Sequence, residues 1–205
     1  QAYYLHKWGG LPGQETRVTP YHLDHAFEER CRRPSDINEH LVTLRDLAAN
    51  CAHVTEFGVR KGVSTFALLH GQPNRLISYD IQPFELAHHA RQISARTWYS
   101  FVQANVLTVT IEETDLLFID TLHVYAQLSA ELNRHQDKVR QYIVLHDTSL
   151  FADRDEGHDG GLGLWPAVEA LLAEGKFVLK ARFHNNNGLT ILERRVPPVL
   201  NLNAR

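Results

Sequence analysis

A short apolar strand, a glycine turn and the start of a helix follow one another in the segment Val54-Thr55-Glu56-Phe57-Gly58-Val59-Arg60-Lys61-Gly62-Val63-Ser64-Thr65. Glycines in such a turn let the backbone bend sharply and approach a ligand closely. The amino end of the helix supplies free N–H groups. The spacing is not GxGxxG, because Arg60 stands where a second glycine would, and this disfavours a dinucleotide-binding fold. On the residues alone, a structural turn and a ligand-binding turn are equally good interpretations.

Short apolar segments and helical stretches alternate on both sides of this turn. The expected strands are Val54–Phe57, Leu76–Tyr79, Tyr99–Val102, Leu116–Ile119 and Tyr142–Leu145, and the expected helices between them are Val63–His70, Phe84–Ser94 and Val124–Val139. Such alternation implies a parallel sheet with helices on both faces. A helix at Trp165–Glu174 and an antiparallel hairpin of Phe177–Phe183 and Gly188–Leu192 follow. The sequence therefore predicts an α/β, Rossmann-like fold with a seven-stranded, mostly parallel sheet.

The chain divides by pattern into two parts. Residues 1–34 are expected to be an irregular arm or substrate cover, and residues 35–205 a single α/β domain. A helix is expected to begin at Ser35 or Asp36, with Asp36 and Glu39 as a capping box, and to end near Asn50. The arm is also the expected place for contacts between subunits, if the protein is a homo-oligomer.

Composition excludes several classes of protein. The chain has 205 residues and a formal net charge of −3, which argues against a nucleic-acid binder. No apolar run approaches the roughly 20 residues that span a bilayer, and residues 1–13 do not resemble a signal peptide. Cys31 and Cys51 cannot build a disulfide framework, which favours the cytoplasm. Because Gln1 is no initiator and Met is absent, we expect the sequence to begin inside its gene product.

Residues 56–64 resemble the first motif of class I S-adenosylmethionine (SAM) dependent methyltransferases, E-x-G-x-x-x-G-x-S, in the form found in relatives of catechol O-methyltransferase. The resemblance implies that Gly58 and Gly62 face the methionine part of SAM. It also implies that Glu56 helps to hold the loop and the amino group of SAM, and that Ser64 contacts its carboxylate.

Two further positions are candidates for the nucleoside part of the cofactor. Asp80 ends the second expected strand, where a carboxylate can accept both hydroxyls of a ribose, although a turn or capping aspartate is the alternative. The resemblance to methyltransferases implies the ribose role for Asp80. It also implies an adenine contact after the third strand, from Asn105 or Gln103.

Two apolar strands run directly into aspartates, at Asp120 and Asp147. Adjacent strands lie about 4.8 Å apart, so the two carboxylates are expected to lie close together at one sheet edge. Carboxylates so placed either share a proton or hold a cation, and oxygen ligands suit Mg²⁺, Ca²⁺ or Mn²⁺. We therefore predict a divalent cation at this edge.

The same segments resemble the metal-binding aspartates of cation-dependent O-methyltransferases, and 120–125 resembles the D-x-x-H-x-Y element of the bacterial cephalosporin hydroxylase and macrocin O-methyltransferase group. The resemblance implies Mg²⁺ on Asp120 and Asp147, with Thr148 as the third ligand. The catechol enzymes carry Asn at the position of Thr148, so water or His146 is the alternative ligand.

His123 is the candidate general base, because an imidazole of pKa near 6.5 can accept a proton from a hydroxyl at neutral pH. The alternative is a histidine that caps the following helix. We expect His146 to be a packed histidine or one that supports the ligands, rather than a ligand itself. The Gly- and Asp-rich segment 151–163 is expected to be either a substrate lid or a solvated loop.

These patterns predict a SAM-dependent methyltransferase that acts on a hydroxyl of a small molecule, natural product or sugar-like, with a divalent cation at Asp120 and His123 as base. No membrane or nucleic-acid partner is expected. The alternatives are a non-catalytic binding protein of the same fold and an N-methyltransferase without metal. A nucleotide-dependent oxidoreductase is disfavoured by the missing GxGxxG.

Overall fold

A computed structural model describes residues 20–94, 96–157 and 160–195 of the chain. The chain forms two compact units, residues 1–106 and 107–205, and each unit is described by itself. None of the helices in the described ranges is long and apolar enough to cross a membrane.

The first unit contains three parallel strands in the order β3-β2-β1. The strands are β1 (His53–Phe57), β2 (Arg75–Asp80) and β3 (Trp98–Gln103), and the helices beside them are α3 (Leu41–Ala48), α4 (Val63–His70) and α5 (Ala87–Ile93). Every residue of β1 is buried, as is the middle of β2, so this strand pair forms the centre of the unit. All six elements lie within about three residues of their predicted bounds, except that α3 is shorter at its amino end.

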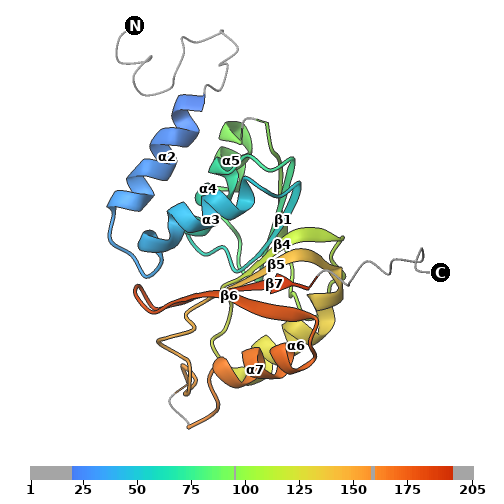
Figure 1. The fold of residues 1–205 in the computed structure, drawn as a ribbon. Helices are drawn as coiled ribbons and strands as arrows, with labels where there is room; N and C mark the ends of the chain where they lie inside the picture. The colour runs from blue at the N-terminus through green and yellow to red at the C-terminus, as the bar shows by residue number, and fades with distance from the viewer. Residues whose placement is uncertain (1–19, 95, 158–159, 196–205) are drawn as a thin grey trace, which may run out of the picture. The chain divides into compact units, whose positions relative to one another are not determined.

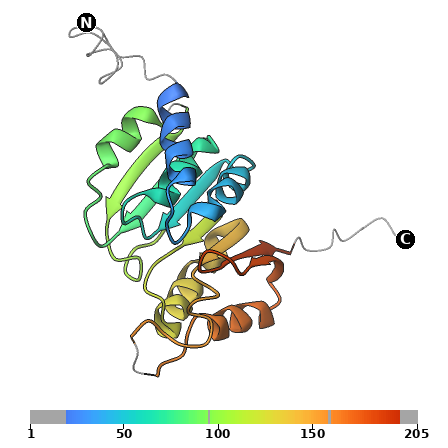
Figure 2. The same cartoon turned by 90° about the vertical axis from the view of Figure 1, so that its left-hand side faces the viewer.

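The amino-terminal part of the chain was expected to be irregular, and the structure corrects this for residues 20–32, which form helix α2 (Pro20–Arg32). Leu23, Ala26 and Phe27 are buried, and α2 packs against α3, α4 and α5. Figure 2 views the unit from the side on which α2 lies. The apolar spacing i, i+3, i+4 was a helix signal, but the surrounding charges obscured it. The expectation for residues 1–19 lies outside the described residues.

The helix expected from Ser35 begins later and without the predicted capping box. A 3₁₀ turn, η1 (Asn38–His40), precedes α3, and its first residues receive no side-chain cap. The carboxylate of Asp36 instead pairs with the guanidinium of Arg60, at 2.5 Å between Oδ2 and Nη2. Asp36 therefore contacts the glycine turn.

The second unit contains four strands in the order β4-β5-β7-β6. The strands are β4 (Thr114–Ile119), β5 (Val139–His146), β6 (Phe177–Phe183) and β7 (Leu189–Arg194), with α6 (Tyr125–His135), η2 (Gln136–Lys138) and α7 (Trp165–Ala173) between them. Strands β4 and β5 are parallel, and the hairpin β6–β7 runs antiparallel to β5. Helices α6 and α7 pack side by side (Figure 1).

The predicted fold is confirmed: seven strands, parallel up to β5 and closed by an antiparallel hairpin, alternate with helices. The consequence for function lies in the pairing of β4 with β5. Ile119 is the register partner of Leu145, so the next residues along the chain, Asp120 and His146, lie beside each other at the ends of the two strands.

Candidate functional site

The glycine turn between β1 and α4 requires backbone conformations that favour glycine. Gly58 has a φ of 81° and Gly62 a φ of 74°, both in the left-handed region. A Cβ at Gly62 would also come within 2.6 Å of Cζ of Phe84. Gly62 therefore cannot accept a side chain without movement of the Phe84 ring.

Asp80 holds this turn from the end of β2. Its Oδ2 accepts hydrogen bonds from the backbone N–H groups of Val59, at 2.8 Å, and Arg60, at 3.0 Å, and its Oδ1 accepts one from Gln82. This is the turn-stabilising geometry that was the alternative to ribose binding. Because Asp80 is only partly buried, the predicted ribose contact stays open.

Glu56 is a buried acceptor beneath the turn. Its side chain is inaccessible to solvent and accepts hydrogen bonds from the hydroxyls of Ser64, Thr65 and Ser78. Glu56 thus ties β1 to the first turn of α4 and to β2. The hydroxyl of Ser64, which is predicted to contact the SAM carboxylate, donates to Glu56 at 2.6 Å in this structure.

Asn105 lies at the surface just beyond β3, where the adenine contact is predicted. Gln103, the other candidate, donates its side-chain N–H to the backbone oxygen of Ile81, which follows Asp80. Both predicted adenine residues therefore belong to the same end of the three-stranded sheet as Asp80.

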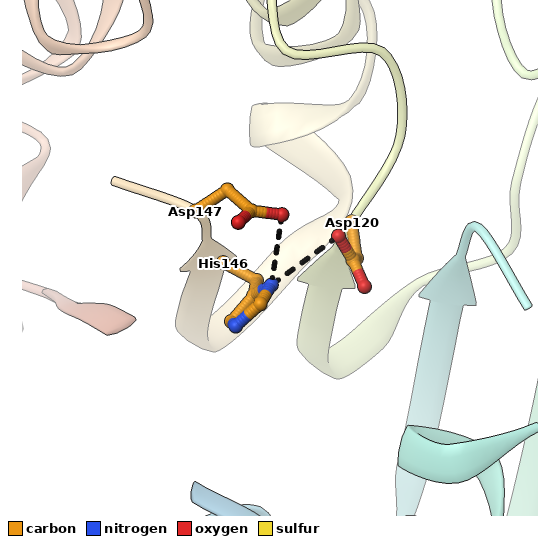
Figure 3. Close-up of side chains that lie close together, drawn as sticks. All are labelled: Asp120, His146 and Asp147. Atoms are coloured by element: carbon orange, nitrogen blue, oxygen red, sulfur yellow. Dashed lines mark hydrogen bonds and ion pairs between the residues drawn. The ribbon is translucent and has the colours of Figure 1, made fainter. Parts of the chain in front are cut away.

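In the second unit, Asp120, His146 and Asp147 form a cluster at the ends of β4 and β5 (Figure 3). One ligand atom from each residue lies within 4.8 Å of the others. Nδ1 of His146 lies 3.0 Å from Oδ2 of Asp147 and 3.4 Å from Oδ1 of Asp120. The predicted proximity of the two aspartates is thus what the pairing of β4 with β5 produces.

Asp147 has an unusual backbone and an orphaned oxygen. Its φ is 58°, a conformation that Asp and Asn tolerate better than other side chains. Its side chain is only 2% exposed, and Oδ1 is buried without a hydrogen-bond partner. A buried carboxylate oxygen without a partner is costly, so this atom is suited to a ligand that supplies positive charge.

His123 completes the cluster and uses both ring nitrogens. Nε2 lies 2.8 Å from Oδ2 of Asp147 and 3.4 Å from Oδ1 of Asp120, and Nδ1 lies 2.7 Å from Oε2 of Glu156. The ring stacks on Phe151 with 4.8 Å between centroids. His123 therefore lies against Asp120, and its role as the base stays a prediction.

The charges of this cluster shift every pKa in it. Burial lowers the pKa of His123, but hydrogen bonds to Asp120 and Asp147 outweigh it and raise the pKa to about 10. The same opposing effects raise the pKa of His146 to about 10. Burial raises the pKa of Asp147, but hydrogen bonds from both histidines hold it well below its usual range. At neutral pH the cluster is therefore two imidazolium cations on two carboxylates.

We expect the metal-free protein to lose stability as the pH rises from about 6.5 to 10. The stabilisation from both histidines is complete below their unfolded pKa, near 6.5, and is lost as the pH passes their folded values near 10. The stabilisation from Asp147 is lost only on acidification, so it does not contribute in this window. The free energy of unfolding in urea, with a chelator present, should fall by several kcal/mol across this window.

His146→Asn should flatten this pH profile, and His88→Asn, on the exposed face of α5, is the matched control. If the free energy of unfolding stayed constant over the window in the unsubstituted protein, the charged form of the two histidines would be refuted.

Two contributors to the cluster were missed by the sequence analysis. Glu156 and Phe151 come from the segment that was expected to be a lid or a solvated loop, and both contact His123. The backbone N–H of Glu156 also donates to the carbonyl oxygen of His123. The only sequence signal was the acidic content of the loop, which did not single out Glu156.

Thr148, the predicted third ligand, is fully buried, and its hydroxyl accepts a hydrogen bond from the Thr190 hydroxyl at 2.9 Å. His146, the alternative ligand, lies against both aspartates, as His123 also does. The Thr148 assignment stays a prediction, and the geometry favours His146 as the third donor.

Glu131 on α6 is a further buried acid of this unit. Oε1 accepts hydrogen bonds from Thr121 and Gln127, while Oε2 is buried without a partner. Burial, opposed by these hydrogen bonds, raises the pKa of Glu131 to about 7. Because Thr121 directly follows Asp120, Glu131 supports the segment that carries the cluster.

A family of sequences described as "Methyltransferase domain" matches residues 55–148, somewhat less than half of the chain. This range begins in β1 and ends just beyond Asp147, so it contains the glycine turn and the cluster. No curated protein matches the chain in sequence.

Solved structures share the fold at low identity. The N-methyltransferase NodS from Bradyrhizobium japonicum WM9, in complex with S-adenosyl-L-homocysteine, has a TM-score of 0.60 at 15% identity, over 88% of this chain and 99% of that chain. A putative caffeoyl-CoA O-methyltransferase from Staphylococcus aureus has a TM-score of 0.62 at 13% identity, over 95% and 97%. The 1,6-didemethyltoxoflavin-N1-methyltransferase of Burkholderia thailandensis has a TM-score of 0.59 at 15% identity, over 91% and 92%.

Proposed function

We propose that the protein is a SAM-dependent methyltransferase that methylates a hydroxyl of a small molecule with help from a divalent cation. The match of residues 55–148 to a family of methyltransferase domains supports this proposal. The observation that carries the cation is the cluster of Asp120, His146 and Asp147. The proposal extends to a cytoplasmic location, because a chain with only two cysteines cannot build a disulfide framework.

The proposed cofactor residues are those of the glycine turn and the ends of β2 and β3. Gly58 and Gly62 give the turn the left-handed conformations with which it is proposed to contact the methionine part of SAM, and Glu56 fixes the turn from below. Asp80 is proposed to hold the ribose and Asn105 the adenine. Asp80 would then serve the turn and the ribose with the same carboxylate, which has capacity for more than its three backbone donors.

The donor set of the cluster fits a divalent cation. Two buried carboxylates and one imidazole offer atoms within 4.8 Å of one another, and Oδ1 of Asp147 lacks any other partner. Carboxylates suit Mg²⁺ and Mn²⁺, and an imidazole donor is compatible with Mn²⁺. When bound, such an ion lowers the pKa of the acceptor hydroxyl and cancels the negative charge that keeps His123 protonated.

His123 is proposed to take the proton from the acceptor hydroxyl through Nε2, the nitrogen that faces Asp120 and Asp147. Glu156 holds Nδ1, and Phe151 holds the plane of the ring. The acceptor oxygen then attacks the methyl carbon of SAM, the carbon–sulfur bond breaks, and S-adenosylhomocysteine leaves. Proximity and orientation supply most of the rate enhancement in such a transfer.

Calorimetry with S-adenosylhomocysteine tests the cofactor assignment. We expect saturable binding, and Asp80→Ala should weaken it by about tenfold or more, because a charge-assisted bidentate contact is lost. Glu85→Ala, an exposed acid a few residues further along, is the matched control and should leave binding unchanged. Absence of binding to the unsubstituted protein would refute the proposed activity.

A metal-independent N-methyltransferase is the second candidate. The charge balance of the cluster supports it, because the cluster needs no cation to be neutral. Two imidazolium groups already neutralise the two aspartates in this structure. Release of S-adenosylhomocysteine with hydroxyl and with amine acceptors, each with Mg²⁺ or with EDTA, separates the candidates. Turnover of amines alone, unchanged by EDTA, would replace the first proposal by the second.

A further inference from the structure

A cavity that is not part of the sites above lies in the first unit, at the carboxyl end of α2. Its volume is about 480 Å³, within the range of small-molecule pockets. Three parts of the unit line it: residues 29, 30 and 33–35 at and after the end of α2, residues 61 and 63 where the glycine turn meets α4, and residues 84–86 ahead of α5.

The cavity is distinct from the proposed cofactor residues. None of Glu56, Gly58, Gly62, Ser64, Asp80 and Asn105 lines it. The ring of Phe84, which forms part of its wall, lies directly against Gly62. A ligand in the cavity would therefore contact the glycine turn through Lys61 and Val63, and not through the residues assigned to SAM.

The wall of the cavity combines an apolar floor with an excess of cations. Val63, Phe84 and Leu86 supply apolar surface, and Leu86 is 38% exposed although it is a large apolar side chain. Arg30, Arg33 and Lys61 face two acids, Glu29 and Glu85. The cations therefore exceed the acids by one.

The three cations are not equivalent. Arg30 is fixed, because Nη1 donates to the carbonyl oxygen of Ala26 and the guanidinium lies 3.8 Å above the ring of Phe66. The neighbouring Glu29 also supplies it with an opposing charge. Arg33 and Lys61 form no ion pair within the part of the chain that the structure describes, whereas Arg32, which does not line the cavity, pairs with Glu28. Arg33 and Lys61 thus remain available to a ligand.

We propose that this cavity is a second binding site, for a small organic anion whose apolar body packs on Val63, Phe84 and Leu86 and whose carboxylate or phosphate group binds Arg33 and Lys61. An anion with an apolar body matches both features of the wall, the excess of cations and the apolar floor. Because Lys61 lies between Gly58 and Gly62, the occupant would contact the segment that holds SAM. The site does not depend on the proposed methyl transfer.

Titration calorimetry with phenyl phosphate and with benzoate tests the site and distinguishes a phosphate from a carboxylate ligand. At least one of the two should bind saturably, and benzyl alcohol, which has the ring without the charge, should bind at least about tenfold more weakly. Inorganic phosphate should also bind more weakly than phenyl phosphate, because it lacks the apolar body.

The double variant Arg33→Gln and Lys61→Gln should weaken binding of the better anion by about tenfold or more. Both side chains are exposed, so the variant should fold, and S-adenosylhomocysteine binding serves as the check. Arg32→Gln is the matched control at the same helix end. Leu86→Trp, which narrows the cavity and keeps every charge, should also weaken binding.

Three results would overturn the site: no saturable binding of either anion, an equal loss in Arg32→Gln, or competition between the anion and S-adenosylhomocysteine for one site. An absence of S-adenosylhomocysteine binding together with intact anion binding would refute the proposed activity and leave the second site standing.

Discussion

Asp147→Asn is expected to lower the affinity for Mn²⁺, and the rate of any cation-dependent methyl transfer, by about 100-fold or more. The substitution removes the negative charge of the one cluster residue that has a buried oxygen without a partner. Asn is the informative replacement, because residue 147 has a φ of 58° and Asn adopts this conformation at little cost. The loss can then be ascribed to charge and not to backbone strain.

The measurements are calorimetry with Mn²⁺ on the purified protein and the rate of S-adenosylhomocysteine release with a hydroxyl acceptor. Asp153→Asn, an exposed position in the adjoining loop, is the control and should change neither quantity. S-adenosylhomocysteine affinity should stay within about threefold in both variants, since neither variant changes a proposed cofactor residue. Unchanged Mn²⁺ affinity in Asp147→Asn would exclude the cluster as the cation site.

Glu56→Ala should destabilise the protein by about 3–5 kcal/mol, because it leaves three buried hydroxyls without their shared acceptor. The variant also opens space between β1, β2 and α4, since the side chain of Glu56 is fully buried. Urea unfolding followed by circular dichroism gives the free energy of unfolding directly.

Variants that each remove one hydrogen-bond donor to Glu56 should lower the stability by a smaller amount. Thr65→Ala and Ser78→Ala each remove one hydrogen bond to Glu56 and should each cost about 1 kcal/mol. The three side chains share one acceptor, so the single costs should not sum to the cost of Glu56→Ala. A cost below about 1 kcal/mol for Glu56→Ala would contradict its role as the buried acceptor of the turn.

The strands were predictable from the sequence because their apolar residues are consecutive and fully buried, as in Leu116–Ile119. Helix α4 was predictable to the residue, because Gly62 sets its start and Gly71 follows its end. Helix α2 was not predicted, since only three buried residues, Leu23, Ala26 and Phe27, stand among many charged ones. Its stability comes from packing on α3 and α4, which a local pattern does not contain.

For the candidate site, the residues at strand ends were predictable, and their partners were not. Asp120 and Asp147 follow apolar strands, and parallel pairing brings such positions together. His146 was given a supporting part because β-strand alternation could not show that its ring lies against both aspartates. Glu156 belongs to a loop without periodicity, and its position follows from contacts across the fold.

The backbone at Asp147 also limits how the cluster could be redesigned for another metal. A His or Glu at this position would have to adopt left-handed dihedrals, at a cost of roughly 1–2 kcal/mol, before any ligand bond formed. Positions 120 and 146 are not among the residues with positive φ in the described chain. An engineer who wishes to change the metal preference of this protein would therefore vary residues 120 and 146 and leave residue 147 as the fixed anchor.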